Sequence, residues 1–159
     1  EYVTGKKAVE KNIMFDGNAF SNLITKGINT TNFFDKCAEK YNFYVTAIQV
    51  EELANMPDEK KNLRVAHLLC LCKMRARLVN TRAIWGKTRY GCCCYSDGKD
   101  PTYKRLLNEN NSNINDALIG DTAKKENCIL VTDDKRFITK LKNCDIQTMT
   151  FDEFYDSVE

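Results

Sequence analysis

Short apolar runs of strand type, each followed by a helical segment, restrict the fold of this sequence more than any other feature. The runs cover residues 13–15, 43–48, 128–131 and 145–150 and are rich in β-branched and aromatic side chains. Strands that alternate with helices form sheets whose neighbours run parallel and whose two faces are both covered. The sequence therefore predicts an α/β fold, a three-layer sandwich with a central, mostly parallel sheet.

The segment from about residue 58 to 112 is the part that this alternation explains least. Residues 58–80 have the composition of a long helix, with an aspartate as its cap and a strongly apolar middle. Residues 81–112 have no clear periodicity and contain several glycines, a proline and three adjacent cysteines. We expect a helical and loop insertion here, within a single domain over residues 1–159 whose first eleven residues are a poorly ordered lead-in.

Composition indicates a soluble protein that acts in a reducing compartment. No run approaches the roughly 18 apolar residues of a membrane span, and no signal-peptide pattern is present, so no membrane partner is expected. Eight cysteines among 159 residues are fewer than a disulfide scaffold contains. We expect the cytoplasm as the site of action. The first residue is Glu1 rather than methionine, which is also compatible with delivery as part of a larger secreted protein.

Acidic residues follow three of the predicted strands and open one further helix. They are Asp16, Glu51, Glu52, Asp116, Asp133 and Asp134. Helix capping explains any one of them alone. In a parallel sheet, however, the carboxyl ends of the strands meet at one edge, where such folds bind ligands. Like charges about 4 Å apart repel by roughly 4 kcal/mol at an effective dielectric near 20, so converging acids need protons or a cation. Oxygen ligands favour Mg²⁺ or Mn²⁺.

Four motifs lie along the chain in a recognisable order. A hydrophobic strand precedes Asp-Gly-Asn at 16–18, Thr46 is followed six residues on by Glu52-Leu53, and the sequences DALIGDTA and TDDKRF occupy residues 116–123 and 132–137. Together these motifs resemble the PIN-domain nucleases, which include the toxin ribonucleases of bacterial toxin–antitoxin pairs. The resemblance extends over about residues 13–151.

The resemblance implies a PIN-like, Rossmann-like fold and a metal-dependent endoribonuclease that hydrolyses phosphodiester bonds of single-stranded or structured RNA, acting as a toxin. It places the catalytic and metal-binding acids at Asp16, Glu52, Asp116 and Asp134. Asp16 and Asp116 are then the direct ligands of Mg²⁺ or Mn²⁺, and the other two hold metal-bound waters or a second ion. Supporting positions and neighbouring acids are Asn18, Thr132, Asp133, Glu51 and Asp121. Gly17 stands where the family usually has Thr or Ser, which is a departure from the pattern.

Basic residues are concentrated between positions 60 and 105, where twelve lysines and arginines stand against two aspartates. Aromatic side chains at 85, 90, 95 and 103 interleave with them, as in surfaces that stack unpaired bases and contact phosphates. A solvated helix face with a few packing aromatics is the alternative. The predicted RNA-binding residues are Lys73, Arg75, Arg77, Arg82, Trp85, Lys87, Arg89, Lys104 and Arg105.

Other functions remain open at this stage. A non-catalytic PIN-fold module that binds RNA or a partner is one alternative, and a PIN-type nuclease that acts on DNA is another. The basic segment could instead dock an acidic antitoxin or immunity protein, and a homodimer is a further expectation. His67 and the cysteines lack the Cys-x-x-Cys spacing of zinc sites. No glycine-rich phosphate loop and no nucleophile elbow occur, so P-loop enzymes and serine hydrolases are excluded.

Overall fold

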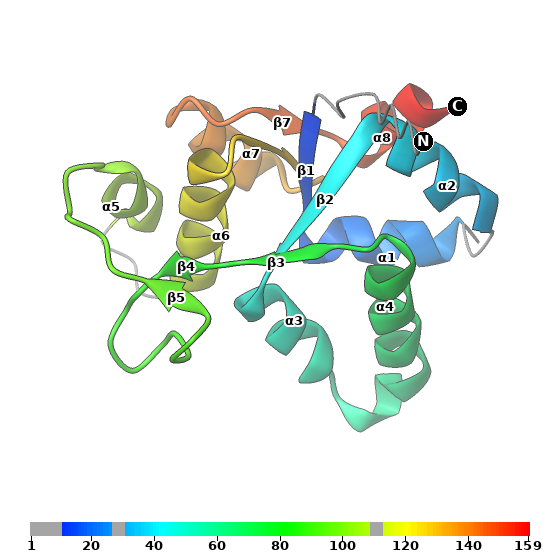
Figure 1. Cartoon of the computed structure of the whole chain (residues 1–159), viewed down its shortest axis with the longest axis horizontal. Coiled ribbons are helices and arrows are strands. Elements are labelled where there is room, and N and C mark those ends of the chain that lie inside the picture. Colours follow the sequence, from blue (N-terminus) through cyan, green and yellow to red (C-terminus); the bar gives the residue numbers. More distant parts are fainter. Residues whose placement is uncertain (1–10, 27–30, 109–112) are drawn as a thin grey trace, which may run out of the picture.

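Five parallel strands form the central sheet of the protein (Figure 1). The computed structural model describes residues 11–26, 31–108 and 113–159. The strand order is β3-β2-β1-β6-β7, and every neighbouring pair is parallel. The strands are β1 Lys11–Phe15, β2 Tyr41–Thr46, β3 Arg77–Val79, β6 Cys128–Val131 and β7 Thr148–Met149. The predicted α/β class and parallel sheet are confirmed.

Helices pack on both faces of the sheet and give three layers. One core contains side chains of α1, α2, α4 and α8, and the other contains side chains of α5, α6 and α7. These helices are α1 Gly17–Thr25, α2 Thr31–Lys40, α4 Lys61–Lys73, α5 Thr102–Leu107, α6 Ile114–Lys125, α7 Lys135–Lys142 and α8 Phe151–Val158. A further helix, α3 Ala47–Ala54, follows β2, and a short 3-10 turn, Asp58–Lys60, precedes α4.

Side chains of the central strand β1 alternate between the two cores. Ile13 and Phe15 belong to the core with α1 and α8, where the ring of Phe15 meets that of Phe154 edge-on at 4.9 Å. Met14 belongs to the opposite core, and all three residues are at most 2% exposed. Because a one-residue slip would exchange the two faces, this alternation fixes where β1 ends.

One glycine allows the helices of the second core to approach closely. A Cβ atom at Gly120, in the middle of α6, would lie 2.7 Å from Cδ1 of Leu106 on α5 and 3.0 Å from Cδ2 of Leu141 on α7. The missing side chain therefore lets α5 and α7 both pack against α6, the helix that carries Asp116.

The segment after residue 58 differs from the expected insertion. The helix predicted over residues 58–80 ends at Lys73, because Arg75 takes a left-handed conformation with a φ of 52°. The chain then enters β3, which pairs with β2 and belongs to the main sheet. Beyond it, β4 Thr81–Arg82 and β5 Cys93–Cys94 form a separate two-stranded sheet.

Two further expectations concern the ends of elements. The strand predicted over residues 43–48 ends at Thr46, whose side chain caps α3. Residues 1–10 of the predicted lead-in lie outside the described residues, and Lys11 already belongs to β1. Within the described ranges, none of the helices is long and apolar enough to cross a membrane.

Candidate functional site

Asp16 lies at the carboxyl end of the central strand and joins two neighbouring strands. The register pairs Phe15 with Val131, so the next residue of each strand, Asp16 and Thr132, emerges at the same level of the sheet. The backbone N–H of Asp16 donates to the carbonyl of Val131 at 2.9 Å. Its Oδ1 accepts from the N–H of Gly17 at 2.7 Å and caps α1, while Oδ2 accepts from the hydroxyl of Thr132 at 2.9 Å.

Thr132 connects Asp16 with the second acid at this edge. Its side chain is completely buried, and its Oγ1 accepts a hydrogen bond from the backbone N–H of Asp134 at 3.2 Å. The Oδ1 of Asp134 in turn accepts from the backbone N–H groups of Arg136 and Phe137, at 2.8 and 3.1 Å, and so caps α7. One hydroxyl thus fixes the junctions of both strands relative to each other.

The structure separates Asp134 from its neighbour Asp133. The carboxylate of Asp133 accepts from the side-chain amide of Asn22 at 2.5 Å and from the backbone N–H of Phe151 at 3.0 Å. It therefore ties α1 and α8 to the end of β6. The charge of Asp134, by contrast, acts on both Asp16 and Asp116. Of the two predicted acids, Asp134 is the one that faces the others.

Glu52 is positioned by a buried glutamine that the sequence analysis missed. Gln49 donates from Nε2 to the carbonyl of Phe15 at 2.6 Å and accepts at Oε1 from the N–H of Thr46 at 2.8 Å. These bonds hold α3 against the end of β1, and Glu52 follows one turn later on that helix. The signal was present as a capping box, a threonine followed three residues on by glutamine.

A second missed residue links α3 to α6. The side-chain amide of Asn115 donates to Oε1 of Glu52. Asn115 directly precedes Asp116 in the first turn of α6, so this bond brings the start of α6 next to Glu52. No spacing pattern in the sequence marks Asn115, because its partner lies 63 positions away along the chain.

Burial and mutual repulsion raise the pKa values of three carboxyl groups at this edge. Burial is the main cause for Asp16, and the charge of Asp134 adds to it, against the hydrogen bonds from Thr132 and Gly17, which lower the pKa. The pKa of Asp116 is raised by burial first and then by the charges of Asp16 and Asp134, whereas Lys140 opposes this.

Glu52 completes this set of coupled acids. Its pKa is raised by burial of the carboxyl group, with repulsion from Asp116 and Asp16 added, while Asn115 and Lys87 act in the opposite direction. The residue as a whole is exposed. The carboxyl group nevertheless lies against Asn115 and beside the other acids, which accounts for the direction of this shift. Four acids predicted from the sequence therefore interact electrostatically at one edge of the sheet.

The donor set fits a hard divalent cation. Carboxylates crowded together and shielded from water are stabilised by a cation, and oxygen ligands favour Mg²⁺ or Mn²⁺. In the parts of the chain that the structure describes, no group of three or more His, Cys, Asp or Glu side chains is gathered closely enough to enclose a metal ion. Mg²⁺ typically uses one or two carboxylates together with water and substrate phosphate, which suits an open edge of this kind.

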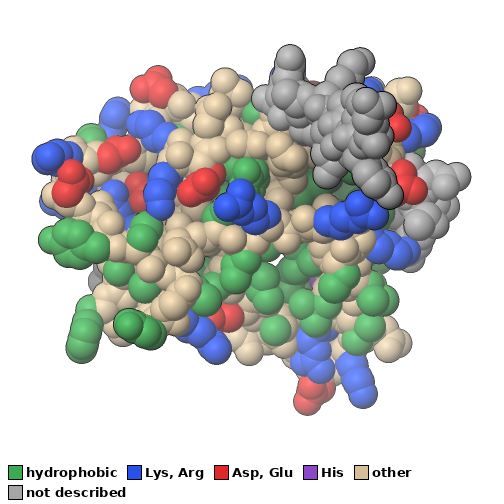
Figure 2. All heavy atoms as spheres, in the orientation of Figure 1, with side chains coloured by type: hydrophobic (Ala, Val, Ile, Leu, Met, Phe, Trp, Pro, Cys, Tyr) green, Lys and Arg blue, Asp and Glu red, His purple; other side chains and the backbone are tan. Residues whose placement is uncertain are grey.

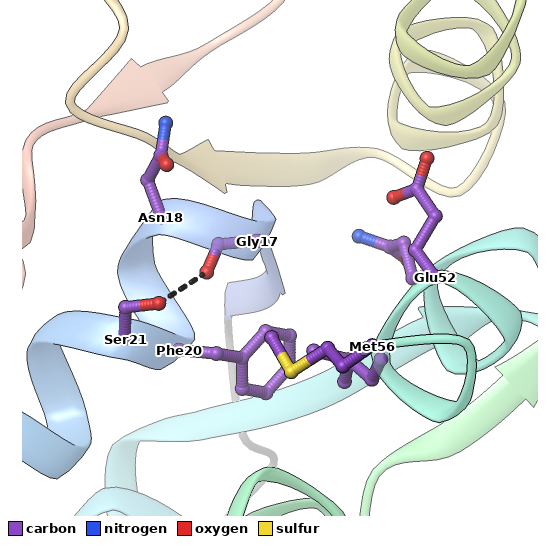
Figure 3. A pocket seen from close by; sticks show the side chains of 8 residues that line it. Gly17, Asn18, Phe20, Ser21, Glu52 and Met56 are labelled. Carbon is purple, nitrogen blue, oxygen red and sulfur yellow. Dashed lines mark hydrogen bonds between the residues drawn. The ribbon is translucent and has the colours of Figure 1, made fainter. Parts of the chain in front are cut away.

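A cavity of about 210 Å³ lies beside Glu52, between α1 and α3 (Figure 3). Phe20 from α1 and Met56 after α3 both line it, and their side chains overlap in this view. The other lining residues are Gly17, Asn18, Ser21, Gln49, Glu52 and Leu53. Asn18, a predicted supporting residue, is exposed at the rim of this cavity.

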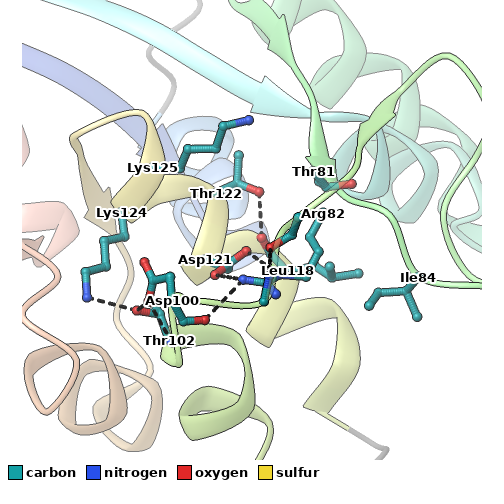
Figure 4. A network of polar contacts seen from close by, with 12 residues as sticks. Thr81, Arg82, Ile84, Asp100, Thr102, Leu118, Asp121, Thr122, Lys124 and Lys125 are labelled. Carbon is teal, nitrogen blue, oxygen red and sulfur yellow. Dashed lines mark hydrogen bonds and ion pairs between the residues drawn. The ribbon is translucent and has the colours of Figure 1, made fainter.

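Two other predicted acids are engaged in ion pairs. Glu51 pairs with Arg89, which ties the loop between β4 and β5 to α3. Asp121 pairs through both oxygens with Arg82, at 3.1 and 3.2 Å (Figure 4). The side chains of this pair are only 11–12% exposed. Asp121 is therefore part of the contact between β4 and α6 and not of the acidic edge.

The predicted RNA-binding residues do not form one patch. Arg82 is bound to Asp121 and lies over the ring of Tyr103, which is itself buried, so neither is open to RNA. Arg75 and Arg77 line a separate hollow of about 350 Å³ with residues 41–44 of β2. Lys87 and Arg89 lie near the acids, since Lys87 lowers the pKa of Glu52 and Arg89 forms an ion pair with Glu51. The remaining residues are Lys73, Trp85, Lys104 and Arg105, all exposed.

His67 and the cysteines have structural surroundings. His67 is fully buried on α4, with its ring 6.3 Å from that of Phe20, and burial lowers its pKa. All eight cysteines are free thiols.

Comparison with known proteins agrees with this geometry. The family model of the PIN domain matches residues 94–141, a segment that contains Asp116, Thr132 and Asp134. No curated protein matches the chain. Together with the parallel sheet and the coupled acids at one edge, this match supports the resemblance to the PIN-domain nucleases.

Proposed function

We propose that this protein is a metal-dependent endoribonuclease that hydrolyses phosphodiester bonds of RNA. The observation that carries the proposal is the coupling of Asp16, Asp116 and Glu52, whose pKa values are raised by burial and by one another's charges, with Asp134 adding to the repulsion. A cluster that is so unfavourable on its own is typical of functional sites rather than of structural ion pairs.

Mg²⁺ or Mn²⁺ is the cofactor in this proposal, held by Asp16 and Asp116 with Glu52 and Asp134 in support. Such an ion would lower the pKa of the water molecule that attacks the phosphate, and it would neutralise charge that develops on the phosphate. The chain's own residues keep the carboxylates in place. Thr132 fixes Asp16 relative to the end of β6, and Asn115 holds Glu52 beside the start of α6.

Unpaired bases of the substrate would stack on the loop between β4 and β5. Trp85 and Tyr90 in this loop, and Tyr95 directly after β5, are 92–103% exposed. Figure 2 shows hydrophobic side chains protruding on that side of the molecule. Trp85 and Tyr90 border an apolar hollow of about 500 Å³. Aromatic faces bind single strands with little sequence preference, while lysine and arginine contact the phosphates. The ion pair between Arg89 and Glu51 places this loop next to the acidic edge.

The biological role that we propose is that of a toxin acting in the cytoplasm. An acidic antitoxin or immunity protein would then cover the basic segment, and self-association as a homodimer belongs to the same proposal. Growth arrest on expression of the chain, and its relief by a co-expressed partner that copurifies with it, would support this role. Unchanged growth with an active nuclease would contradict it.

Two alternatives have specific support. Gly17, which stands where the family usually has Thr or Ser, favours a non-catalytic module that only binds RNA or a partner. The stacking surface does not by itself distinguish RNA from DNA, because every base has a π-face.

A nuclease assay separates these readings. The wild type and Asp116→Asn are compared on single-stranded RNA, duplex RNA and single-stranded DNA, with Mg²⁺, with Mn²⁺ and with a chelator. We expect cleavage of single-stranded RNA that requires the metal and is lost in the variant. Equal residual activity of both proteins would contradict the proposal that the chain is an enzyme. Preferential cleavage of DNA would show that DNA, and not RNA, is the substrate.

A further inference from the structure

The cavity between α1 and α3 has a composition that the hydrolytic chemistry alone does not require. Phe20, Leu53 and Met56 give it apolar walls, although it opens directly beside the acid Glu52. Ligand sites in proteins commonly combine apolar walls with a few polar groups that fix orientation. A site for a phosphate and a cation needs no such apolar part.

We propose that this cavity is a subsite for one unpaired nucleobase, namely the base of the nucleotide whose phosphate lies at the acidic edge. The inference rests on the proposed function, since it places the phosphate at Asp16 and Asp116. Glu52 belongs to both the edge and the cavity, so a nucleotide bound at one extends naturally into the other.

The polar lining suits the edge of a base. The amide of Asn18 offers both donors and an acceptor, and the carboxylate of Glu52 accepts. The hydroxyl of Ser21 donates to the carbonyl of Gly17 at 3.4 Å and offers its oxygen as a further acceptor. Proteins read unpaired RNA bases by packing on their faces and by hydrogen bonds to their edges. The apolar walls and the polar rim provide both kinds of contact.

The size of the cavity argues for a single base rather than a larger group. Cavities that bury drug-sized molecules measure about 300–1,000 Å³. At about 210 Å³, this one is smaller and matches one ring system with its substituents. A helix or an extended peptide of a partner protein would not enter it.

Gly17 keeps the entrance to this subsite clear. A Cβ atom added to it would meet nothing within 4 Å, and its backbone is not in the left-handed region. The backbone therefore does not require glycine here. Because Gly17 lines the cavity, a side chain at this position would take up space that the base needs.

The test uses short single-stranded RNAs in which one nucleotide at a time is replaced by an abasic one. Binding is measured with Asp116→Asn, whose altered residue does not line the cavity, and cleavage is measured with the otherwise unchanged protein. We expect one abasic position, fixed relative to the cleaved bond, to weaken binding on the order of tenfold. Fragment ends should show a base preference at that same position.

Matched variants on α1 connect this effect with the cavity. Ser21→Met fills the cavity and should abolish both the abasic effect and the base preference. Thr25→Met, at an exposed position one turn further along the same helix and outside the cavity lining, should preserve them. Gly17→Val serves as a second filling variant if Ser21→Met does not fold.

Two failures can be told apart. Cleavage of RNA with no position-dependent abasic effect, or with an effect that both filling variants leave unchanged, overturns the subsite and leaves the nuclease intact. Absence of both cleavage and RNA binding in the wild type overturns the proposed function and the subsite with it.

Discussion

The hydroxyl of Thr132 donates a 2.9 Å hydrogen bond to Oδ2 of Asp16, between the ends of two adjacent parallel strands. This bond lowers the pKa of a carboxyl group that burial and Asp134 raise. It therefore keeps Asp16 ionised down to a lower pH than its surroundings alone would allow.

Replacing Thr132 by valine should impair catalysis without unfolding the protein. The change keeps the shape of the side chain but removes the bond, so the pKa of Asp16 rises further. Hydrogen bonds to charged groups contribute about 1.5–3 kcal/mol, which corresponds to a loss of roughly 10–150-fold in kcat/KM. The acid limb of the pH–rate profile should move to higher pH. Thr132→Ser, which keeps the hydroxyl, should retain the wild-type profile, and an unchanged profile in Thr132→Val would contradict this role.

Asp116→Asn should stabilise the metal-free protein at neutral pH while it removes activity. Because the pKa of Asp116 is raised in the folded state, the folded protein holds this proton more tightly than the unfolded chain. Stability therefore falls as pH rises above 3.8, the ordinary pKa of this carboxyl group, and through the higher pKa of the folded state. Thermal unfolding without metal should show a higher Tm for the variant at pH 7, by about 2–4 °C for each 1 kcal/mol of repulsion relieved.

The difference should vanish near pH 3, where both states of the wild type are protonated at this site. Added Mg²⁺ should raise the Tm of the wild type more than that of the variant, because it binds the folded state. A variant that is less stable than the wild type at pH 7 would contradict the repulsion inferred for Asp116.

Gln49 should be important for stability although it is uncharged and is not one of the proposed metal ligands. Gln49→Leu removes the donor to the carbonyl of Phe15 and the acceptor for the N–H of Thr46. Each buried group left without a partner costs about 1–3 kcal/mol. Urea unfolding should show this loss, and activity should fall as well, because Glu52 follows on the same helix. Wild-type stability of Gln49→Leu would show that α3 is held by other contacts.

The pair of Arg82 and Asp121 should be structural rather than RNA-binding. Arg82→Met leaves the carboxylate of Asp121 nearly buried and without its partner, and breaking a buried pair in this way costs about 3–5 kcal/mol. The double variant Arg82→Met, Asp121→Leu should recover much of that loss in chemical unfolding. Its RNA affinity should depend on salt as in the wild type, and a shallower dependence would restore Arg82 to the RNA-binding set.

Trp85 and Lys87 should affect RNA binding in different ways. Trp85→Ala should weaken binding of single strands by about 5–150-fold, the range of 1–3 kcal/mol for stacking of one base, and leave the salt dependence unchanged. Lys87→Gln should instead make the slope of log affinity against log salt shallower by about 0.7, the value for one phosphate contact on a single strand. Trp85→Phe, which keeps an aromatic ring, is the matched control. If Trp85→Ala weakened the binding of duplex RNA as much as that of single strands, the result would contradict stacking.

Local patterns explain why much of the site was predictable. Asp16 and Asp134 are recognisable because each caps a helix directly after a buried strand, a relation within a few residues. Asp116 is recognisable in a similar way, because it lies in the first turn of a helix, α6. The core of the parallel sheet was predictable for a related reason, since β6 is an uninterrupted apolar run.

Contacts between distant segments explain what the sequence analysis missed. Arg77 of β3 looks like part of a basic helix, because only its pairing with Tyr44 of β2 makes it a strand. Arg82 and Tyr103 resemble surface residues for RNA until Asp121 is brought against them. Neither relation leaves a periodic trace in the amino-acid order.

The small β4–β5 sheet has a consequence for where the substrate would be cut. Arg82 of β4 is anchored to Asp121, and Asp121 lies on the same helix as Asp116. The aromatic loop and the carboxylate of Asp116 are therefore connected through this ion pair and helix α6. This connection should fix the distance between the stacked bases and the cleaved bond. Fragments should then end a constant number of nucleotides from the stacked bases, whatever the length of the RNA.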